Sequence, residues 1–525
     1  MPPARNDTRR AAGARWVAVL LALASIVFAV VQLESAARGV TVQRLWLEQT
    51  PVNVFRPPDH TLIAGSAPVV LIAHGFAGSQ QLMQPFALTL ARNGFIAVSF
   101  DFPGHGRHGA PMRGGLADAQ QSQRTLLASM AQMSDFARRL PGGDGRLALV
   151  GHSMASDIVV RHAQADPAVV ASVGVSLFAP SIRADTPADS PRNLLVITGA
   201  LEPELLAREA LRVVGPGALT DTTYGRFDAG TARRATRAPG VEHIGVLYSA
   251  HTQAETLAWL NAAFGRPATA QPFIDARGPW LGLLLAGVLL LAWPLAQWLP
   301  RVGDGQVAGE RVRWWRWQGQ APLALLPALL TPLLLWKVPG NFVPILLGDY
   351  LLLHFALYGL LTLALLRWAG RRLPPLPRGR ALAFGVAVLA ASAYALLAVG
   401  VPIDRYLFNM QPTLQRLPWI ALLCTGTLTY FLADEASTRD GRAAPGAYVV
   451  AKACFLLSLV LAIALNPPRL FFLAIIVPAI LLLFIVYGLF GRWIGQRTRH
   501  PAVAAAALAL AFAAFIGISF PRVGA

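Results

Sequence analysis

Cysteine and charge are both scarce in this sequence. Its 525 residues include 2 cysteines, Cys424 and Cys454, and both lie in apolar runs. The stretch of mixed composition from residue 40 to about residue 272 therefore has no disulfide and no cysteine metal site. Charged residues make up 14% of the chain and hydrophobic residues 55%. A chain of this composition is not an ordinary soluble protein, because much of its surface must face something other than water.

The formal net charge of +18 could suggest a nucleic-acid-binding protein, but the distribution of the charge argues against one. Residues 34–275 contain 20 Arg and 19 Asp plus Glu, so this part is nearly neutral. The excess lies in a basic tail, residues 1–15, and in short breaks between apolar runs. This pattern is typical of membrane topology, and we expect a lipid bilayer as partner and no nucleic acid.

Nine apolar runs approach the length of about 20 residues that a membrane span needs. The first, residues 16–32, follows the basic tail and is predicted to be an uncleaved signal anchor. A cleaved signal peptide is the alternative, with small residues downstream at Ser35-Ala36-Ala37. The other eight form a predicted polytopic domain, residues 280–520, with spans at 280–299, 321–336, 342–366, 381–401, 417–432, 447–465, 470–490 and 502–520.

Positive residues alternate between the loops that join these runs. The positive loops contain Arg301, Arg311, Arg313, Arg316, Arg371, Arg372, Arg378, Arg380, Arg439, Arg442, Arg492, Arg497 and Arg499. The intervening loops contain only Lys337, Arg405, Arg416 and Arg469. The positive-inside rule then predicts a multi-pass protein of the cell (plasma or inner) membrane, with a cytoplasmic N-terminus and with residues 33–278 outside. The run 321–336 has three prolines and could instead be re-entrant, which would upset this parity.

Between residues 40 and 270, segments typical of strands alternate with segments typical of helices. Strands are expected at 68–73, 95–100, 147–150, 173–178, 194–198 and 244–248. Such alternation predicts an α/β fold, with a mostly parallel sheet and helices on both of its faces. An all-α transmembrane domain is expected to follow it.

A serine lies at the corner between an expected strand and an expected helix. Residues 146–150 are typical of a short buried strand, residues 154–163 of a helix, and Ser153 stands between them. The small residues Gly151 and Ala155 lie two places before and after it. They suit a tight, strained turn at which strand and helix approach closely and the hydroxyl is exposed. This geometry favours nucleophilic catalysis.

Two further motifs accompany the serine corner: His74-Gly75-Phe76 after the strand 68–73, and Asp101 to Gly106 after the strand 95–100. With Gly151-His152-Ser153-Met154, and in this order and spacing, they resemble an α/β-hydrolase over about residues 40–267. The family usually closes its serine corner with glycine, and Ala155 is a mild departure from that pattern. The resemblance implies a serine hydrolase that needs no cofactor. The sequence has no metal cluster, glycine-rich phosphate loop or nucleotide fingerprint.

The family's chain order of serine, acid and histidine implies the catalytic roles. Ser153 is the expected nucleophile, and Glu202, after the strand 194–198, is the expected acid, with Asp185 as the alternative. The family's base lies after the last strand and before the final helix, which here indicates His251. His243 would lie at the start of the strand expected at 244–248, too early for that role.

The resemblance further implies that the backbone N–H groups of Phe76 and Met154 bind the oxyanion that forms when Ser153 attacks an acyl carbon. The predicted function is a membrane-anchored extracytoplasmic serine hydrolase that cleaves an ester or amide bond, and acyl esters, lipids and peptides all fit as substrates. The alternative is a transporter or envelope-assembly protein with a regulatory or inactive hydrolase-like domain. A contact between Asp349 and Lys452, inside two apolar runs, would support the alternative.

Overall fold

The computed structural model describes residues 5–62, 66–115, 118–267, 270–304, 317–439 and 443–524, with side chains from residue 13 onward. The chain forms two compact units. The sheet unit comprises Phe28–Leu283, Ile403–Gln411 and Pro521–Ala525, and the helical unit comprises Met1–Val27, Leu284–Pro402 and Pro412–Phe520. Arg311, Arg313, Arg316 and Arg442, on which part of the topology prediction depends, lie outside the described residues.

The sheet unit is built on a nine-stranded sheet in the order β1-β2-β4-β3-β6-β7-β8-β10-β9. The strands from β4 to β10 in that order are parallel, whereas β1, β2 and β9 pair in antiparallel fashion at the edges. The bounds are β1 Thr41–Leu47, β2 Thr50–Arg56, β3 Ala67–Ala73, β4 Ile96–Phe100, β6 Gly143–His152, β7 Val169–Val175, β8 Leu194–Gly199, β9 Thr223–Tyr224 and β10 Arg233–Ala238.

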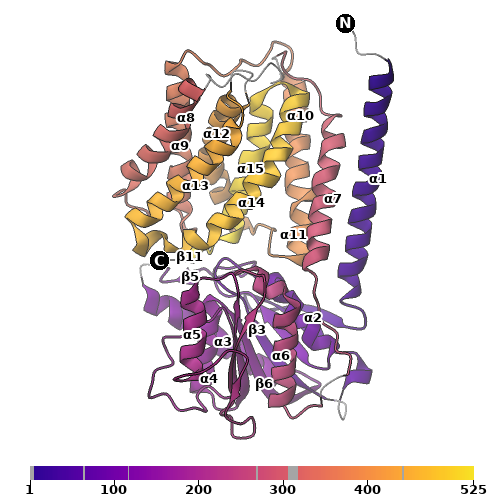
Figure 1. The fold of residues 1–525 in the computed structure, drawn as a ribbon, viewed down its shortest axis with the longest axis vertical. Helices are drawn as coiled ribbons and strands as arrows, with labels where there is room; N and C mark the ends of the chain where they lie inside the picture. The colour runs from indigo at the N-terminus through magenta and orange to yellow at the C-terminus, as the bar shows by residue number, and fades with distance from the viewer. Residues whose placement is uncertain are drawn as a thin grey trace. The chain divides into compact units, whose positions relative to one another are not determined.

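Helices cover both faces of this sheet, as the α/β pattern of the sequence predicts. They are α2 Gln84–Arg92, α3 Ala119–Arg138, α4 Met154–Ala165, α5 Glu204–Val214 and α6 Ala250–Ala263. One face packs against α3 and α4, with α5 beside them, and the other packs against α2 and α6 (Figure 1). The central strand β3 is apolar and buried along its whole length, as expected for a parallel strand that is covered on both faces.

The last parallel strand is not the predicted one. Residues 245–248 form a short 3-10 helix, and β10 takes the position beside β8. The sequence of β10, Arg-Arg-Ala-Thr-Arg-Ala, has almost none of the apolar and aromatic residues that indicate a strand. It forms one because Arg233 is buried with its guanidinium donating to the carbonyl oxygens of Pro187, Ala188, Ser190 and Pro191. These bonds satisfy Nε and Nη2 of the guanidinium, so the strand tolerates a buried arginine.

Two segments from the second half of the chain belong to the sheet unit. Residues 403–411 contact the loops that follow β3 and β4. The C-terminal strand β11, Val523–Gly524, pairs in parallel with β5, Met112–Arg113. The sequence has no motif that indicates either contact.

The helical unit and its flanking helices hold the candidate membrane spans. Their bounds are α1 Arg5–Ser35, α7 Gly278–Ala296, α8 Trp317–Leu335, α9 Gly348–Trp368, α10 Ala381–Ala393, α11 Gly400–Tyr406, α12 Leu417–Thr438, α13 Ala447–Leu465, α14 Pro467–Thr498 and α15 Pro501–Ser519. A π-helical turn at Tyr394–Ala398 lies between α10 and α11. Within the described residues, nine segments are helical, long and apolar enough to cross a membrane, as predicted.

Small residues allow the helices of this unit to approach one another closely. A Cβ on Gly426 of α12 would lie 2.5 Å from the carbonyl oxygen of Leu352 on α9, and one on Gly359 would meet the backbone of α12 at 2.6 Å. Glycines at such crossings are typical of membrane helices. The proline-containing run that could have been re-entrant is the continuous helix α8.

Candidate active site

Ser153 lies at the corner between β6 and α4, as its sequence context predicts. Its backbone is in an unusual conformation, with φ 52° and ψ −115°. Its N–H donates to the carbonyl oxygen of Val175 at 2.8 Å, which ties the strained corner to β7. Gly151 is required there, since a Cβ on it would lie 2.6 Å from the carbonyl oxygen of Ala155. Ala155 itself is fully buried between α4 and the sheet.

Glu202 lies in the turn after β8, and its carboxylate is held on several sides. One carboxylate oxygen, Oε2, accepts from the N–H of Gly199 at 2.6 Å and from the hydroxyl of Ser176 at 3.0 Å. The other, Oε1, faces the imidazole of His243, whose Nδ1 is 2.5 Å away. With only 1% of its side chain exposed, Glu202 is confined to this one orientation.

His243 connects this carboxylate to the serine. Its Nε2 lies 2.9 Å from Ser153 Oγ, and Glu202 is on the opposite side of the ring. A carboxylate can only accept here, so Nδ1 carries the proton and Nε2 accepts from the serine hydroxyl. The three side chains are thus within hydrogen-bond distance of one another in sequence, in the arrangement that a Ser-His-Glu triad requires.

His251, the base that the sequence analysis expects, does not contact Ser153 in this structure. His251 lies in the first turn of α6, and its Nε2 is 2.9 Å from Thr236 Oγ1 on β10. The error follows from the strand assignment: with β10 as the last strand, the loop before the final helix carries His243. Recognising residues 233–238 as a strand would have led to His243, but their composition conceals it. The alternative acid, Asp185, is exposed and lies beside Arg183.

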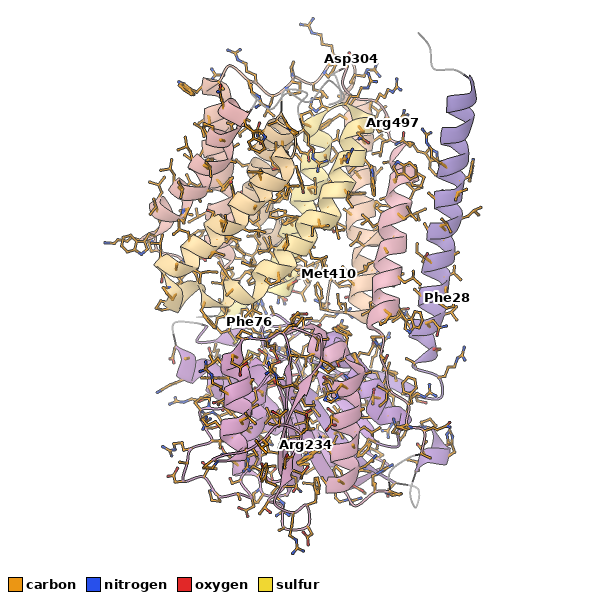
Figure 2. All side chains as sticks on the ribbon, in the orientation of Figure 1. Phe28, Phe76, Arg234, Asp304, Met410 and Arg497 are labelled. Carbon is orange, nitrogen blue, oxygen red and sulfur yellow. The ribbon has the colours of Figure 1, made fainter. Side chains whose placement is uncertain are left out.

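The two residues predicted to bind an oxyanion flank the serine corner. Met154 is the first residue of α4, and helix geometry leaves the N–H at that position without a partner inside the helix. Phe76 belongs to the turn after β3, residues 74–78, which we call the oxyanion turn. A Cβ on its Gly75 would lie 2.8 Å from His152 Nδ1 and 3.1 Å from Ser153 Cβ, so this turn packs directly against the serine corner. The carboxyl end of β3 therefore brings Phe76 to the serine's edge of the sheet, away from Arg234 near the start of β10 (Figure 2).

Comparison with known families agrees with this geometry. Residues 65–218 match the family model described as serine aminopeptidase, S33. This region is an α/β-hydrolase domain. The match is to a family of serine hydrolases, which confirms the prediction that this domain is a serine hydrolase of the α/β-hydrolase type. No curated protein matches the chain.

Solved structures resemble the hydrolase domain at low identity. Protein TT1662 from Thermus thermophilus is 18% identical, with 43% of this chain and 99% of that one covered, at a TM-score of 0.32. Est1E from Butyrivibrio proteoclasticus is 13% identical, with 43% and 99% covered, at a TM-score of 0.32. A dienelactone hydrolase from Anabaena variabilis is 15% identical, with 42% and 98% covered, at a TM-score of 0.30.

A second histidine supports the loop that carries the candidate base of the hydrolase. The Nε2–H of His152 donates to the carbonyl oxygen of His243 at 3.0 Å. Burial lowers the pKa of His152 well below its ordinary value, because the charged ring would lose its hydration. His152 is therefore neutral at physiological pH and holds the His243 backbone by a hydrogen bond.

Exposed apolar side chains accompany the residues of the site along the chain. Phe178 follows Ser176 by two positions, Leu201 precedes Glu202, and Ile244 follows His243. Their exposed fractions are 52%, 67% and 38%.

Among the described residues no three His, Cys, Asp or Glu side chains are grouped as a metal ion would require.

The contact between Asp349 and Lys452 is not formed. Lys452 Nζ lies 2.6 Å from Asp434, and Asp349 lies 3.3 Å from Arg469. Each ionisable group thus has a partner of opposite charge other than the one considered. The contact between α9 and α13 that would have supported the transport alternative is therefore not formed by Asp349 and Lys452.

Proposed function

We propose that the protein is a membrane-anchored extracytoplasmic serine hydrolase that cleaves an ester or amide bond through an acyl-enzyme on Ser153. The observation that carries this proposal is the pair of contacts at His243, 2.9 Å to Ser153 Oγ and 2.5 Å to Glu202 Oε1. The extracytoplasmic placement is supported by the alternation of arginine between the loops.

The geometry supports a complete sequence of steps. Ser153 Oγ attacks the acyl carbon while its proton passes to His243 Nε2, and Glu202 stabilises the imidazolium. The N–H groups of Met154 and Phe76 bind the oxyanion, and losing one such donor typically costs about 2.7–4 kcal/mol of transition-state stabilisation. When the intermediate collapses, the leaving group takes the proton from His243. A water molecule then attacks the acyl-enzyme, again with His243 as base, and regenerates Ser153.

The apolar side chains of Phe178, Leu201 and Ile244 favour a substrate with an apolar acyl or leaving group. These three residues neighbour Ser176, Glu202 and His243 along the chain, and exposed apolar side chains near a polar site usually contribute to ligand binding. An acyl ester at the surface of a bilayer would fit both these apolar side chains and a chain with nine candidate membrane spans among its described residues. A peptide without apolar side chains would not use these contacts.

Labelling of the purified full-length protein with a fluorophosphonate probe tests the proposal. Wild type should label, and Ser153→Ala should not. A series of p-nitrophenyl esters should then show kcat/KM rising with acyl length. No labelling of folded wild type, or equal labelling of Ser153→Ala, would contradict an activated serine at this position.

A further inference from the structure

The segment 403–411 comprises the last residues of α11 and the first part of the connection to α12, yet it is part of the sheet unit. Its main contact is with Arg107, in the loop that follows β4. Arg107 Nη2 lies 2.8 and 2.7 Å from the two carboxylate oxygens of Asp404, and its Nε donates to Asn409 Oδ1 at 2.9 Å. One guanidinium is thus held by two side chains of the segment.

A second contact reaches the loop that follows β3. The backbone N–H of Asn409 donates to Ser79 Oγ at 2.9 Å, and both residues are buried. The segment is itself ordered by its own hydrogen bonds, since Met410 N–H donates to Asp404 Oδ1 at 3.0 Å. It therefore presents a defined surface to both loops.

These two loops are also joined to each other beneath the segment. The backbone N–H of Arg107 donates to Asp101 Oδ2 at 2.9 Å, and that of Gln80 donates to Asp101 Oδ1 at 2.7 Å. Ser79 and Gln80 directly follow the oxyanion turn, which is closed by the Gly78 N–H donating to the Gly75 carbonyl oxygen. A continuous chain of contacts thus runs from Asp404 to the turn that contains Phe76.

We propose that Asp404 and Asn409 are positioning residues of the hydrolase, which act through Arg107 and Ser79 to hold the oxyanion turn against Ser153. This inference rests on the proposed function. An oxyanion donor works only when it lies about 2.7–3.1 Å from the developing charge. A displacement of about 1 Å can cost about a hundredfold in rate. The helical half of the chain thereby contributes residues to the hydrolase as well as spans.

Asp404→Ala in the full-length protein tests this role. The side chains of Arg107 and Asp404 are 31% and 12% exposed, and a partly exposed ion pair adds only about 0–1 kcal/mol to stability. We therefore expect kcat for a p-nitrophenyl ester, per site titrated with fluorophosphonate, to fall about tenfold with KM nearly unchanged. The exchange of charges in Arg107→Asp with Asp404→Arg should recover much of that loss.

Asp166→Ala is the matched control. It removes the ion pair between Arg138 and Asp166, which is similarly exposed. Asp166 follows α4, whose end lies at the opposite edge of the sheet from Ser153 because the helix runs back along the strands. The control should leave kcat and KM within about twofold, as expected for a surface change. If Asp404→Ala does not fold, Ser79→Ala takes its place as the test. It removes only the acceptor of the Asn409 N–H and should lower kcat a few-fold.

The outcomes separate this inference from the proposed function. Unchanged kcat per titrated site in both Asp404→Ala and Ser79→Ala would overturn the positioning role while the hydrolase stands. An equal fall in Asp166→Ala would also overturn it, since the effect would then be general destabilisation. Absence of Ser153-dependent turnover in wild type would overturn both.

Discussion

In each half of the molecule a buried carboxylate holds a nitrogen-containing side chain, and the two pairs are built in opposite ways. In the sheet unit Glu202 holds His243 at 2.5 Å, and the histidine remains 22% exposed with its second nitrogen on Ser153. In the helical unit Asp434 holds Lys452 at 2.6 Å, and both side chains are almost completely buried. In the first pair, the second ring nitrogen of His243 faces the hydroxyl of Ser153. In the second pair, the ammonium of Lys452 is surrounded by its own partners and faces no nucleophile of this kind.

Aromatic rings enclose the pair in the helical unit. Lys452 Nζ lies 4.6 Å from the ring centre of Phe484, 4.7 Å from that of Tyr430 and 4.9 Å from that of Tyr448, and it also donates to the Tyr430 hydroxyl. Such cation–π contacts compensate part of the lost hydration of the charge. Burial of charge alone therefore does not mark a reactive site. A third group placed to react, and access to it, are needed as well.

The largest expected effect separates the two candidate bases of the hydrolase. His243→Ala should lower kcat by about 10³-fold or more, because it removes the group that takes the serine proton. His251→Ala should leave kcat within about threefold, since its ring contacts Thr236 and not Ser153. Steady-state hydrolysis by matched amounts of folded protein measures both. A larger loss of kcat in His251→Ala than in His243→Ala would instead make His251 the base.

Breaking the pair in the helical unit should change stability and not hydrolysis. Lys452→Met leaves Asp434 buried without its partner, which typically costs about 3–5 kcal/mol. The double variant Lys452→Met with Asp434→Leu should recover most of this loss, because no charge remains unpaired. Thermal unfolding in detergent measures the stability, and ester hydrolysis per titrated site should stay within about twofold. A selective loss of kcat in a stable variant would show that this pair takes part in function.

A smaller effect concerns an enclosed histidine beside the hydrolase site. Burial lowers the pKa of His74 from 6.5 to about 4. A lowered histidine pKa gives stability that is complete above pH 6.5 and is lost as the pH falls toward 4, by up to about 3 kcal/mol. Asp101 opposes this trend, since burial raises its pKa to about 6 and its contribution is lost as the pH rises through that value.

Unfolding midpoints between pH 7.5 and 4.5 test this prediction. His74→Gln should lower stability at pH 7.5 and flatten the decline toward acid pH relative to wild type. An unchanged slope would mean that His74 is hydrated in the native state, more like the accessible His243 than the enclosed Lys452.

Local features of the sequence were sufficient to place Ser153 at the strand-to-helix corner and Glu202 after β8, and to locate the spans. The corner at Ser153 depends on a short strand, a short helix and small neighbours such as Gly151, all within a few residues. Glu202 follows an apolar strand, which periodicity detects. A membrane span is likewise a property of a continuous segment, because each residue of it must be compatible with lipid.

Only the tertiary structure decided which histidine reaches the serine and which partner each charge in the helical unit takes. It alone also showed that residues 403–411 belong to the sheet unit. His243 is placed by β10, which is a strand because distant carbonyl oxygens bind the buried Arg233. Lys452 meets Asp434, and Arg107 meets Asp404, across intervals of the chain that carry no periodic signal. The physical reason is common to all three: buried polar groups take whichever partner packing brings near, and packing is set by contacts between segments far apart in sequence.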